Sequence, residues 1–131
     1  MNVDVGRKVL GIGMDLVEVE RIAKAIERQG ERFLDRVYTA AERAYCETKR
    51  NSAPFFAVRF AAKEAVAKAF GTGIGGEIGL LDIEVGHHPT GAPLIRLHGN
   101  GAQLAERRGV VEVLVTLTHT EVTAGATVVL Q

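Results

Sequence analysis

Two carboxylates and a lysine have the residue types and spacing that phosphoryl-transfer chemistry requires. Asp15 follows Gly11 and Gly13 at alternate positions of an extended segment, and Glu64 lies four residues before Lys68 in an alanine-rich helical segment. Mg²⁺ takes one or two protein carboxylates and completes its octahedron with water and substrate phosphates. A lysine one helical turn away can neutralise another phosphate oxygen. If the helix packs across the glycine face of the strand, Asp15 and Glu64 converge on one metal site.

Each of these residues also has a purely structural interpretation. Glu64 and Lys68 have the favourable i,i+4 orientation of a surface ion pair, which contributes only about 0.3–0.5 kcal/mol. Asp15 can cap the helix that begins near Val19. The sequence alone leaves both interpretations open.

The helix that carries Glu64 and Lys68 is unusually apolar. Residues Pro54 to Phe70 are apolar around most of the helical circumference, and charges on a largely buried helix usually meet a partner or a ligand. Arg59 and Lys63 form a separate stripe about 100° away. We expect Lys63 to matter less to any chemistry than Lys68.

A glycine-rich segment and one histidine complete the candidate residues. Residues 71–76 follow a helix and lack the Lys-Ser/Thr ending of a P-loop. Gly71 alone can end the helix, but the glycines also allow backbone amides to approach a phosphate or a flat cofactor. His119 ends a strand and is either a surface group or a ligand-binding group. His87 and His88 lack a third ligand of suitable spacing, so they indicate zinc only weakly.

Composition excludes several classes of protein. Among 131 residues, 16 Lys and Arg balance 16 Asp and Glu, so no net basic field exists to hold nucleic acid or an anionic membrane. Apolar residues make up 47% of the chain, which supplies a core without disulfide or structural-metal staples. Cys46 is the only cysteine, and no apolar window has the length of a membrane span. We expect a single domain over residues 1–131 in a soluble, cytoplasmic protein.

Hydrophobic periodicity predicts an α+β fold with helices packed on one face of a mainly antiparallel sheet. In the strand over residues 9–17, the apolar alternate positions are expected to face the core and the glycine positions to be bare. Helices are predicted over residues 18–30, 39–49, 54–70 and 101–108, and Thr39 and Glu42 have the capping-box spacing that opens the second of them. Strands are predicted over residues 81–85, 94–97, 111–118 and 122–130.

Three separated segments resemble a known family. Residues 11–22 (GIGMDLVEVERI), 59–74 (RFAAKEAVAKAFGTGI) and 118–120 (THT) are similar to the holo-acyl-carrier-protein synthase group of 4′-phosphopantetheinyl transferases, in the family order. Residues 33–42 and 82–85 also resemble that group, so the match covers nearly the whole chain. Such enzymes move 4′-phosphopantetheine from coenzyme A to a serine of an apo acyl carrier protein and release adenosine 3′,5′-bisphosphate. The resemblance also implies a 4′-phosphopantetheinyl transferase-like fold.

The resemblance implies a role for each candidate residue. Asp15 and Glu64 would bind Mg²⁺, and Glu64 and Lys68 would be catalytic, with either Glu64 or a metal-held water accepting the serine proton. The residues implied to contact coenzyme A are Lys68, Gly71, Thr72, Gly73, Ile74 and His119. Arg21 would engage the acidic carrier protein, and Lys24 and Arg28 share its helical face by their spacing.

The resemblance further implies a homotrimer with active sites between subunits. Residues 91–93 read Gly-Ala-Pro where the family often has a basic residue before the proline, so no binding role is assigned to that loop. Two other classes of function stay open. A metal-dependent hydrolase of a nucleotide or pyrophosphate compound would use the same residues with water as nucleophile, and a noncatalytic oligomeric binding module would use the carboxylates only structurally.

Overall fold

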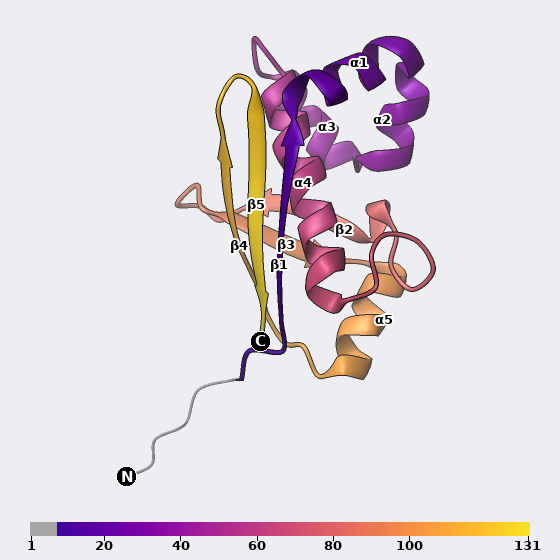
Figure 1. Ribbon diagram of the computed structural model, residues 1–131, viewed down its shortest axis with the longest axis vertical. Coiled ribbons are helices and arrows are strands. Elements are labelled where there is room, and N and C mark those ends of the chain that lie inside the picture. Colours follow the sequence, from indigo (N-terminus) through magenta and orange to yellow (C-terminus); the bar gives the residue numbers. More distant parts are fainter. Residues whose placement is uncertain (1–7) are drawn as a thin grey trace.

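The computed structural model describes residues 8–131, in which one strand is followed by a run of helices and then by two pairs of strands separated by a helix (Figure 1). Residues 1–7, the start of the predicted domain, lie outside the described part. The helices are α1 (Val19–Gln29), α2 (Glu31–Val37), α3 (Ala40–Glu47), α4 (Ala53–Phe70), the 3₁₀ helix η1 (Leu80–Asp82) and α5 (Gly99–Arg108). The strands are β1 (Gly11–Glu18), β2 (Ile83–His87), β3 (Pro93–Leu97), β4 (Val113–His119) and β5 (Thr123–Leu130).

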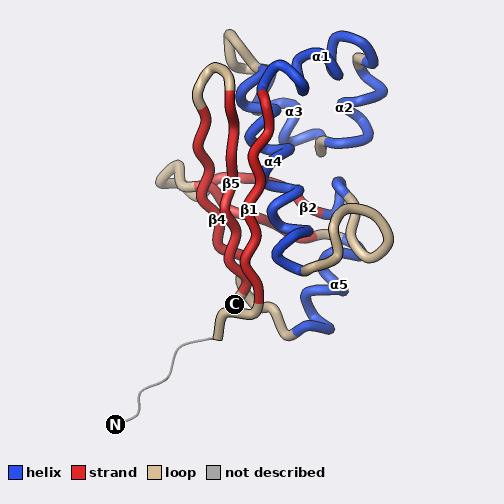
Figure 2. Tube along the Cα trace, viewed as in Figure 1, coloured by secondary structure: helices blue, strands red, loops and turns tan. Residues whose placement is uncertain are grey.

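The strands form two antiparallel sheets, which confirms the predicted α+β class. One sheet has three strands in the order β1-β5-β4, and the other is the hairpin of β2 and β3. Helix α4 runs along one face of the three-stranded sheet, with α1 to α3 at one end and α5 at the other (Figure 2). The hairpin crosses beside α4, so this central helix has protein around most of its surface.

The glycines of β1 allow α4 to pack directly on the strand backbone. A Cβ added at Gly13 would lie 2.1 Å from the carbonyl oxygen of Ala65, and one at Gly11 would lie 2.1 Å from that of Ala69. The apolar side chains of β1 therefore point away from the helix, with exposed fractions of 68% for Ile12, 60% for Met14 and 64% for Leu16. The expectation that this apolar face lies in the core was wrong, because a helix approaches a strand most closely where side chains are missing.

Two local signals in the sequence are confirmed and one helix was missed. Thr39 and Glu42 form the capping box of α3, and Gly71 ends α4 with a left-handed φ of 81°. Helix α2 was not predicted. Its seven residues are too few to show a clear helical period, and it is stabilised by burying Phe33, Leu34 and Val37.

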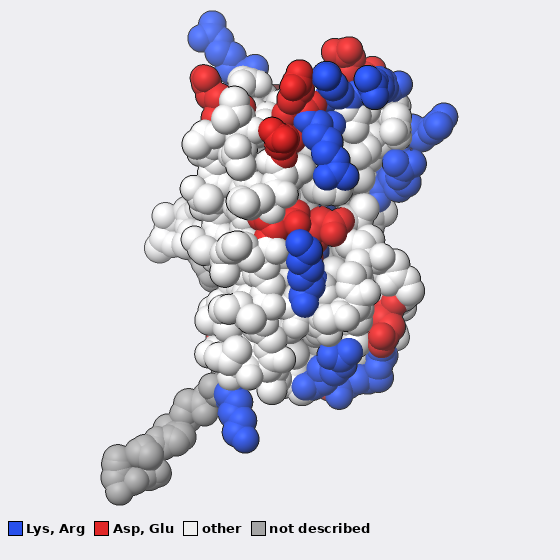
Figure 3. Space-filling view, viewed as in Figure 1, with Lys and Arg blue, Asp and Glu red and all other residues white. Residues whose placement is uncertain are grey.

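Charged side chains are unevenly distributed over the molecule. In Figure 3 they gather over α1 and α2, whereas the side formed by the three-stranded sheet is almost free of them. Within residues 8–131, no helix has the length and apolar character needed to cross a bilayer.

We expect Gly13→Ala to lower the free energy of unfolding by about 3 kcal/mol, because the added methyl group must displace the backbone of α4. Gly86→Ala in β2 is the matched control. There the added Cβ would meet the end of the Arg96 side chain at 2.7 Å, and that side chain can move. Urea unfolding of both variants measures the difference, and equal effects would contradict the close contact between β1 and α4.

Candidate active site

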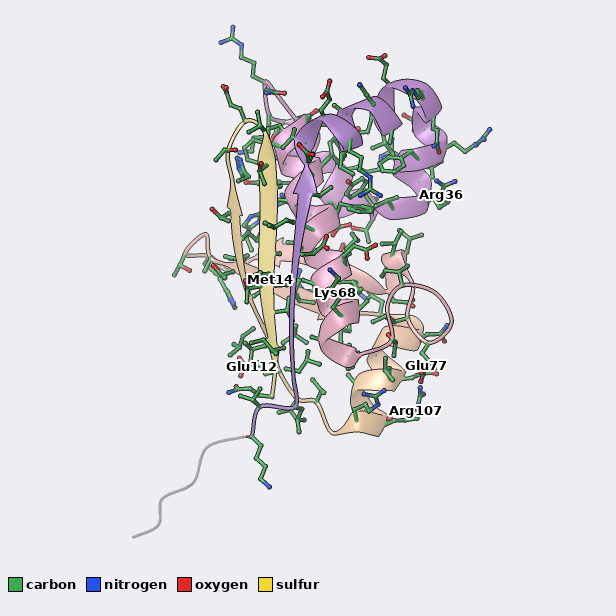
Figure 4. All side chains as sticks on the ribbon, in the orientation of Figure 1. Met14, Arg36, Lys68, Glu77, Arg107 and Glu112 are labelled. Atoms are coloured by element: carbon green, nitrogen blue, oxygen red, sulfur yellow. The ribbon has the colours of Figure 1, made fainter. Side chains whose placement is uncertain are left out.

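Asp15 and Lys68 come from adjacent elements and form an ion pair. The Nζ atom of Lys68 lies 2.8 Å from Oδ1 of Asp15 and donates to the carbonyl oxygen of Met14 at 3.3 Å. Figure 4 shows Lys68 on α4 beside β1, near Met14. Asp15 shares the α4-facing side of β1 with the two glycines, so the close packing of helix and strand positions its carboxylate.

Neither structural interpretation of these residues describes the site. Lys68 pairs with Asp15 rather than with Glu64. The residue at the start of α1 is Glu18, and no side chain caps that end of the helix. Asp15 is therefore not a helix cap. Its side chain is 16% exposed.

The charges of Asp15, Glu64 and Lys68 act on one another, and we call these three residues the carboxylate site. Burial, followed by the negative charge of Asp15, raises the pKa of Glu64, while Lys68 and Arg21 oppose that rise. The hydrogen bond from Lys68 to Asp15, and then the charge of Asp15, raise the pKa of Lys68. Asp15 and Glu64 thus lie close enough to repel each other, as the convergence of strand and helix predicts.

The donor set of the carboxylate site fits Mg²⁺. No group of three or more His, Cys, Asp or Glu side chains that could hold a metal ion occurs among the residues described. A cage made entirely of protein ligands, as zinc or calcium prefers, is therefore not offered. Two carboxylates that repel each other suit a cation that keeps waters and substrate oxygens as its other ligands. Asp15 and Glu64 are the residues that would hold it.

The glycine loop, residues 71–79, begins directly after the helix that carries Glu64 and Lys68. The amide of Gly71 donates to the carbonyl oxygen of Lys68 at 2.9 Å, and the amides of Thr72 and Gly73 donate to that of Ala67 at 3.2 and 3.3 Å. These amides end the helix and are not free to bind a phosphate. The loop therefore starts within one helical turn of Lys68, and its first amides have a structural role.

His119 lies in a different place, in a cavity of about 240 Å³ that we call the arginine cavity. Its lining includes Tyr45, Phe55, Arg59, His87, Pro93 and His119. The rings of Phe55 and His119 are 5.1 Å apart, centroid to centroid. Pro93, and Gly91 before it, belong to the loop to which the sequence assigned no binding role, yet both line this cavity.

Arg59 is a buried cation with which no carboxylate of residues 8–131 forms an ion pair. Its residue is 2% exposed, and its Nε atom has no hydrogen-bond partner in the described part of the chain. Its Nη1 donates to the carbonyl oxygen of Phe55 at 3.1 Å, and its guanidinium lies 4.5 Å from the ring centroid of Tyr45. Its Nη2 is 3.4 Å from Nε2 of His87, which must accept because a guanidinium only donates. Burial, and then the charge of Arg59, lower the pKa of His87, consistent with a neutral ring.

A second cation lies against two aromatic rings that line the arginine cavity. Nζ of Lys49 lies 4.6 Å from the ring centroid of Tyr45 and 5.1 Å from that of Phe55. Aromatic rings with Arg59 in the lining and Lys49 beside them suit an anionic ligand that carries a flat ring, and no acidic residue of the described part lines the cavity. Sequence reasoning missed this group, although Arg59 on an apolar helix was a signal for it.

The carboxylate site and the arginine cavity lie at opposite edges of the three-stranded sheet. Asp15 is on β1 and His119 is on β4, with β5 paired between these strands. Glu64 faces the β1 side of α4, whereas Arg59 contacts α3, β2 and the cavity at the β4 side. The structure thus brings Asp15, Glu64 and Lys68 together, but it does not place His119 with them in one chain.

The three basic residues predicted on α1 are all exposed. The guanidinium of Arg21 lies 6.0 Å from the ring centroid of Phe60, and its charge reaches Glu64. Lys24 forms an i,i+4 ion pair with Glu20 at 3.5 Å. Arg28 lies in the last turn of the helix. Arg21 is therefore the member of this basic face that adjoins the carboxylate site.

Comparison with known proteins decides the family. The model of the 4′-phosphopantetheinyl transferase superfamily matches residues 11–126. The chain belongs to this superfamily. It is 49% identical over 123 residues to a holo-[acyl-carrier-protein] synthase of Koribacter versatilis, covering 94% of this chain and 98% of that protein. A protein of the same name from Solibacter usitatus is 45% identical over 123 residues, with the same coverage.

Solved structures agree with the fold. The holo-[acyl-carrier-protein] synthase of Neisseria meningitidis superimposes with a TM-score of 0.88 at 33% identity, over 95% of this chain and 99% of that one. The Helicobacter pylori enzyme, solved in complex with coenzyme A, gives a TM-score of 0.82 at 33% identity, over 92% of this chain and 99% of that one. The predicted transferase-like fold is confirmed.

We expect Asp15→Asn to lower the pKa of Glu64 in the metal-free protein, because a negative charge that disfavours ionisation of Glu64 is removed. The pKa should stay above the ordinary value, since burial is the larger cause. Lys68→Met should raise it. NMR titration of the side-chain carboxyl carbons measures these shifts, with Asp35→Asn on α2 as the control. An unchanged Glu64 pKa in Asp15→Asn would show that the two carboxylates do not interact.

Proposed function

We propose that this chain transfers 4′-phosphopantetheine from coenzyme A to a serine of apo acyl carrier protein and releases adenosine 3′,5′-bisphosphate. The observation that carries the proposal is the convergence of Asp15, Glu64 and Lys68 in a member of the 4′-phosphopantetheinyl transferase superfamily. The alignment with the relatives named holo-[acyl-carrier-protein] synthase covers nearly the whole length of each relative and of this chain. One solved neighbour contains coenzyme A.

The chemistry follows from the charges of the carboxylate site. Asp15 and Glu64 would hold Mg²⁺, which would supply positive charge to polarise the pyrophosphate oxygens of coenzyme A. The Lys68 ammonium would neutralise charge that develops on the phosphoryl oxygens. The attacking serine hydroxyl must lose its proton, and Glu64 can accept it through a carboxylate oxygen that does not hold the metal.

The separation of the two groups of residues supports the predicted homotrimer with active sites between subunits. Coenzyme A carries phosphates and an adenine ring, which match the cations and aromatic faces of the arginine cavity. Rotation about a cyclic axis can bring the arginine cavity of one subunit to the carboxylate site of its neighbour. Ile12, Met14, Leu16 and Leu114 are exposed on the outer face of the sheet and offer the apolar surface that such an assembly buries.

The docking surface for the carrier protein is the basic face of α1. Arg21, Lys24 and Arg28 are exposed on this helix, and Arg21 adjoins the carboxylate site. An acidic helix that binds here would bring its serine toward Glu64. The cytoplasmic location and the single domain remain predictions from the sequence.

Intact-mass spectrometry of apo acyl carrier protein tests the reaction. Incubation with this protein, coenzyme A and Mg²⁺ is expected to add one phosphopantetheine group to the carrier. Asp15→Ala and Glu64→Ala should abolish the addition while the protein stays folded, and Lys68→Ala should slow it by about 30- to 1,000-fold. Glu31→Ala removes an exposed ion pair with Arg43, and neither residue belongs to the carboxylate site, the glycine loop or the basic face of α1, so this variant is the control. Free phosphopantetheine without modified carrier would instead indicate a hydrolase.

Charge reversal at Arg21 tests the docking surface. Arg21→Glu is expected to raise the KM for the carrier about tenfold at low salt and less at high salt, because exposed charges mainly govern encounter and orientation. The KM for coenzyme A should change little. Arg50→Glu is the control, since Arg50 is also exposed but lies in the turn after α3, outside the basic face of α1. A defect confined to coenzyme A would remove α1 from the docking surface.

A further inference from the structure

The end of the glycine loop is held from inside the molecule by Lys63. This side chain is 0% exposed, although the residue precedes Glu64 on α4. Its Nζ donates to the carbonyl oxygen of Leu80 at 3.0 Å and to that of Ile83. Both acceptors lie just after the loop, at η1 and the start of β2. One ammonium group thus connects the middle of α4 to the segment that leaves the loop.

Glu42 completes the surroundings of this ammonium group. Its Oε1 lies 2.8 Å from Nζ of Lys63, and its side chain is also 0% exposed. Its Oε2 accepts from the amide of Val85 at 2.7 Å, and Oε1 accepts from that of Thr39 at 2.9 Å. The same carboxylate therefore begins α3, neutralises Lys63 and holds β2.

The start of the glycine loop is attached to the same helix. Gly71 and the two residues after it donate to carbonyl oxygens of the last turn of α4. Near the other end, Ile78 is fully buried, and the amide of Gly79 donates to Oδ2 of Asp82 at 2.8 Å. The first residues of the loop are thus held to α4 by backbone hydrogen bonds. The segment that follows the loop is held to α4 by the side chain of Lys63.

A role in stability alone does not account for this arrangement. A buried ion pair adds little stability over apolar residues of similar volume, whereas it imposes strict geometry. Burial lowers the pKa of Lys63 and Glu42 opposes that change, so the carboxylate helps to keep the ammonium charged. Only a long side chain with several donors can satisfy the two carbonyl oxygens and the carboxylate together.

We propose that Lys63 is a positioning residue of the coenzyme A site, where it sets the place of the glycine loop relative to Glu64 and Lys68. The proposal rests on the proposed function, because it takes the loop to contact coenzyme A. The sequence led us to expect that Lys63 contributes less to the chemistry than Lys68, and the proposal gives Lys63 a separate role in coenzyme A binding. Lys63 acts through the loop and does not touch the reacting atoms.

Two variants separate this role from stability. Lys63→Met leaves the Glu42 carboxylate buried without its cation, and should lower Tm by about 10 °C or more. Glu42→Gln/Lys63→Met removes both charges and should recover much of that loss. Both variants lack the bonds to Leu80 and Ile83. Both should therefore raise the KM for coenzyme A about tenfold, because the loop must be ordered on binding, while kcat and the carrier KM change less than the KM for coenzyme A.

A second readout needs no substrate. Hydrogen exchange of the free protein should show faster exchange in residues 74–79 in both variants, with the strands of the three-stranded sheet unchanged in the double variant. Tyr38→Phe is the matched control, since it removes a buried hydrogen bond of 2.7 Å to the carbonyl oxygen of Phe56, at the other end of α4. It should lower Tm without altering the loop or the KM for coenzyme A.

Asp82→Ala tests the same loop end at a half-buried position outside the Lys63–Glu42 ion pair. It removes the bond to Gly79 and should also raise the KM for coenzyme A, so it decides the matter if neither Lys63 variant folds. The proposal is overturned if the double variant has wild-type exchange and KM, or if Tyr38→Phe raises the KM equally. A wild-type protein that modifies no carrier would contradict the proposed function instead, and the exchange measurement would still test Lys63.

Discussion

The contact between α4 and the side-chain-free face of β1 is the constraint on which the rest of the structure depends. With only hydrogen atoms at Gly11 and Gly13, the helix backbone lies against the strand. Asp15, next on the same face, is thereby brought to Lys68 and within the field of Glu64. The same contact turns the apolar side chains of β1 outward. The candidate site and the uncovered apolar face of the sheet thus have one physical cause.

Helix α4 carries charged residues with different partners on three of its sides. Toward β1 it carries the carboxylate site, and toward β4 it carries Arg59 in the arginine cavity. On a third side Lys63 enters the interior and meets Glu42. A helix with charges on several sides cannot be amphipathic in the usual sense, so each charge needs a partner of its own. Arg59 is the one for which the described residues supply no carboxylate, which is why an anionic ligand suits the cavity.

The sequence predicted most of the fold because long periodic segments and their end signals are local. It also offered the convergence of Asp15 and Glu64 as one of two open interpretations, since a helix that packs across the two glycines would bring these carboxylates together. It misassigned the face of β1, because alternation shows that two faces differ but not which one a helix covers. The capping box of Thr39 and Glu42 was predictable, but the bonds of Lys63 to Glu42 and to the end of the glycine loop were not. Those partners lie about twenty residues away from Lys63 in the chain, and only the tertiary fold brings them together.

A spacing set by main-chain atoms has a consequence for the motion of the site. Where two elements meet through side chains, rotamer changes let the distance between them fluctuate, but Gly13 and the carbonyl of Ala65 have no rotamers to exchange. The separation of the two carboxylates can then vary only through the χ angles of Asp15 and Glu64. Little conformational entropy remains to be lost when a ligand fixes those angles. The backbone contact between strand and helix thus preorganises the two carboxylates more rigidly than contact through side chains would.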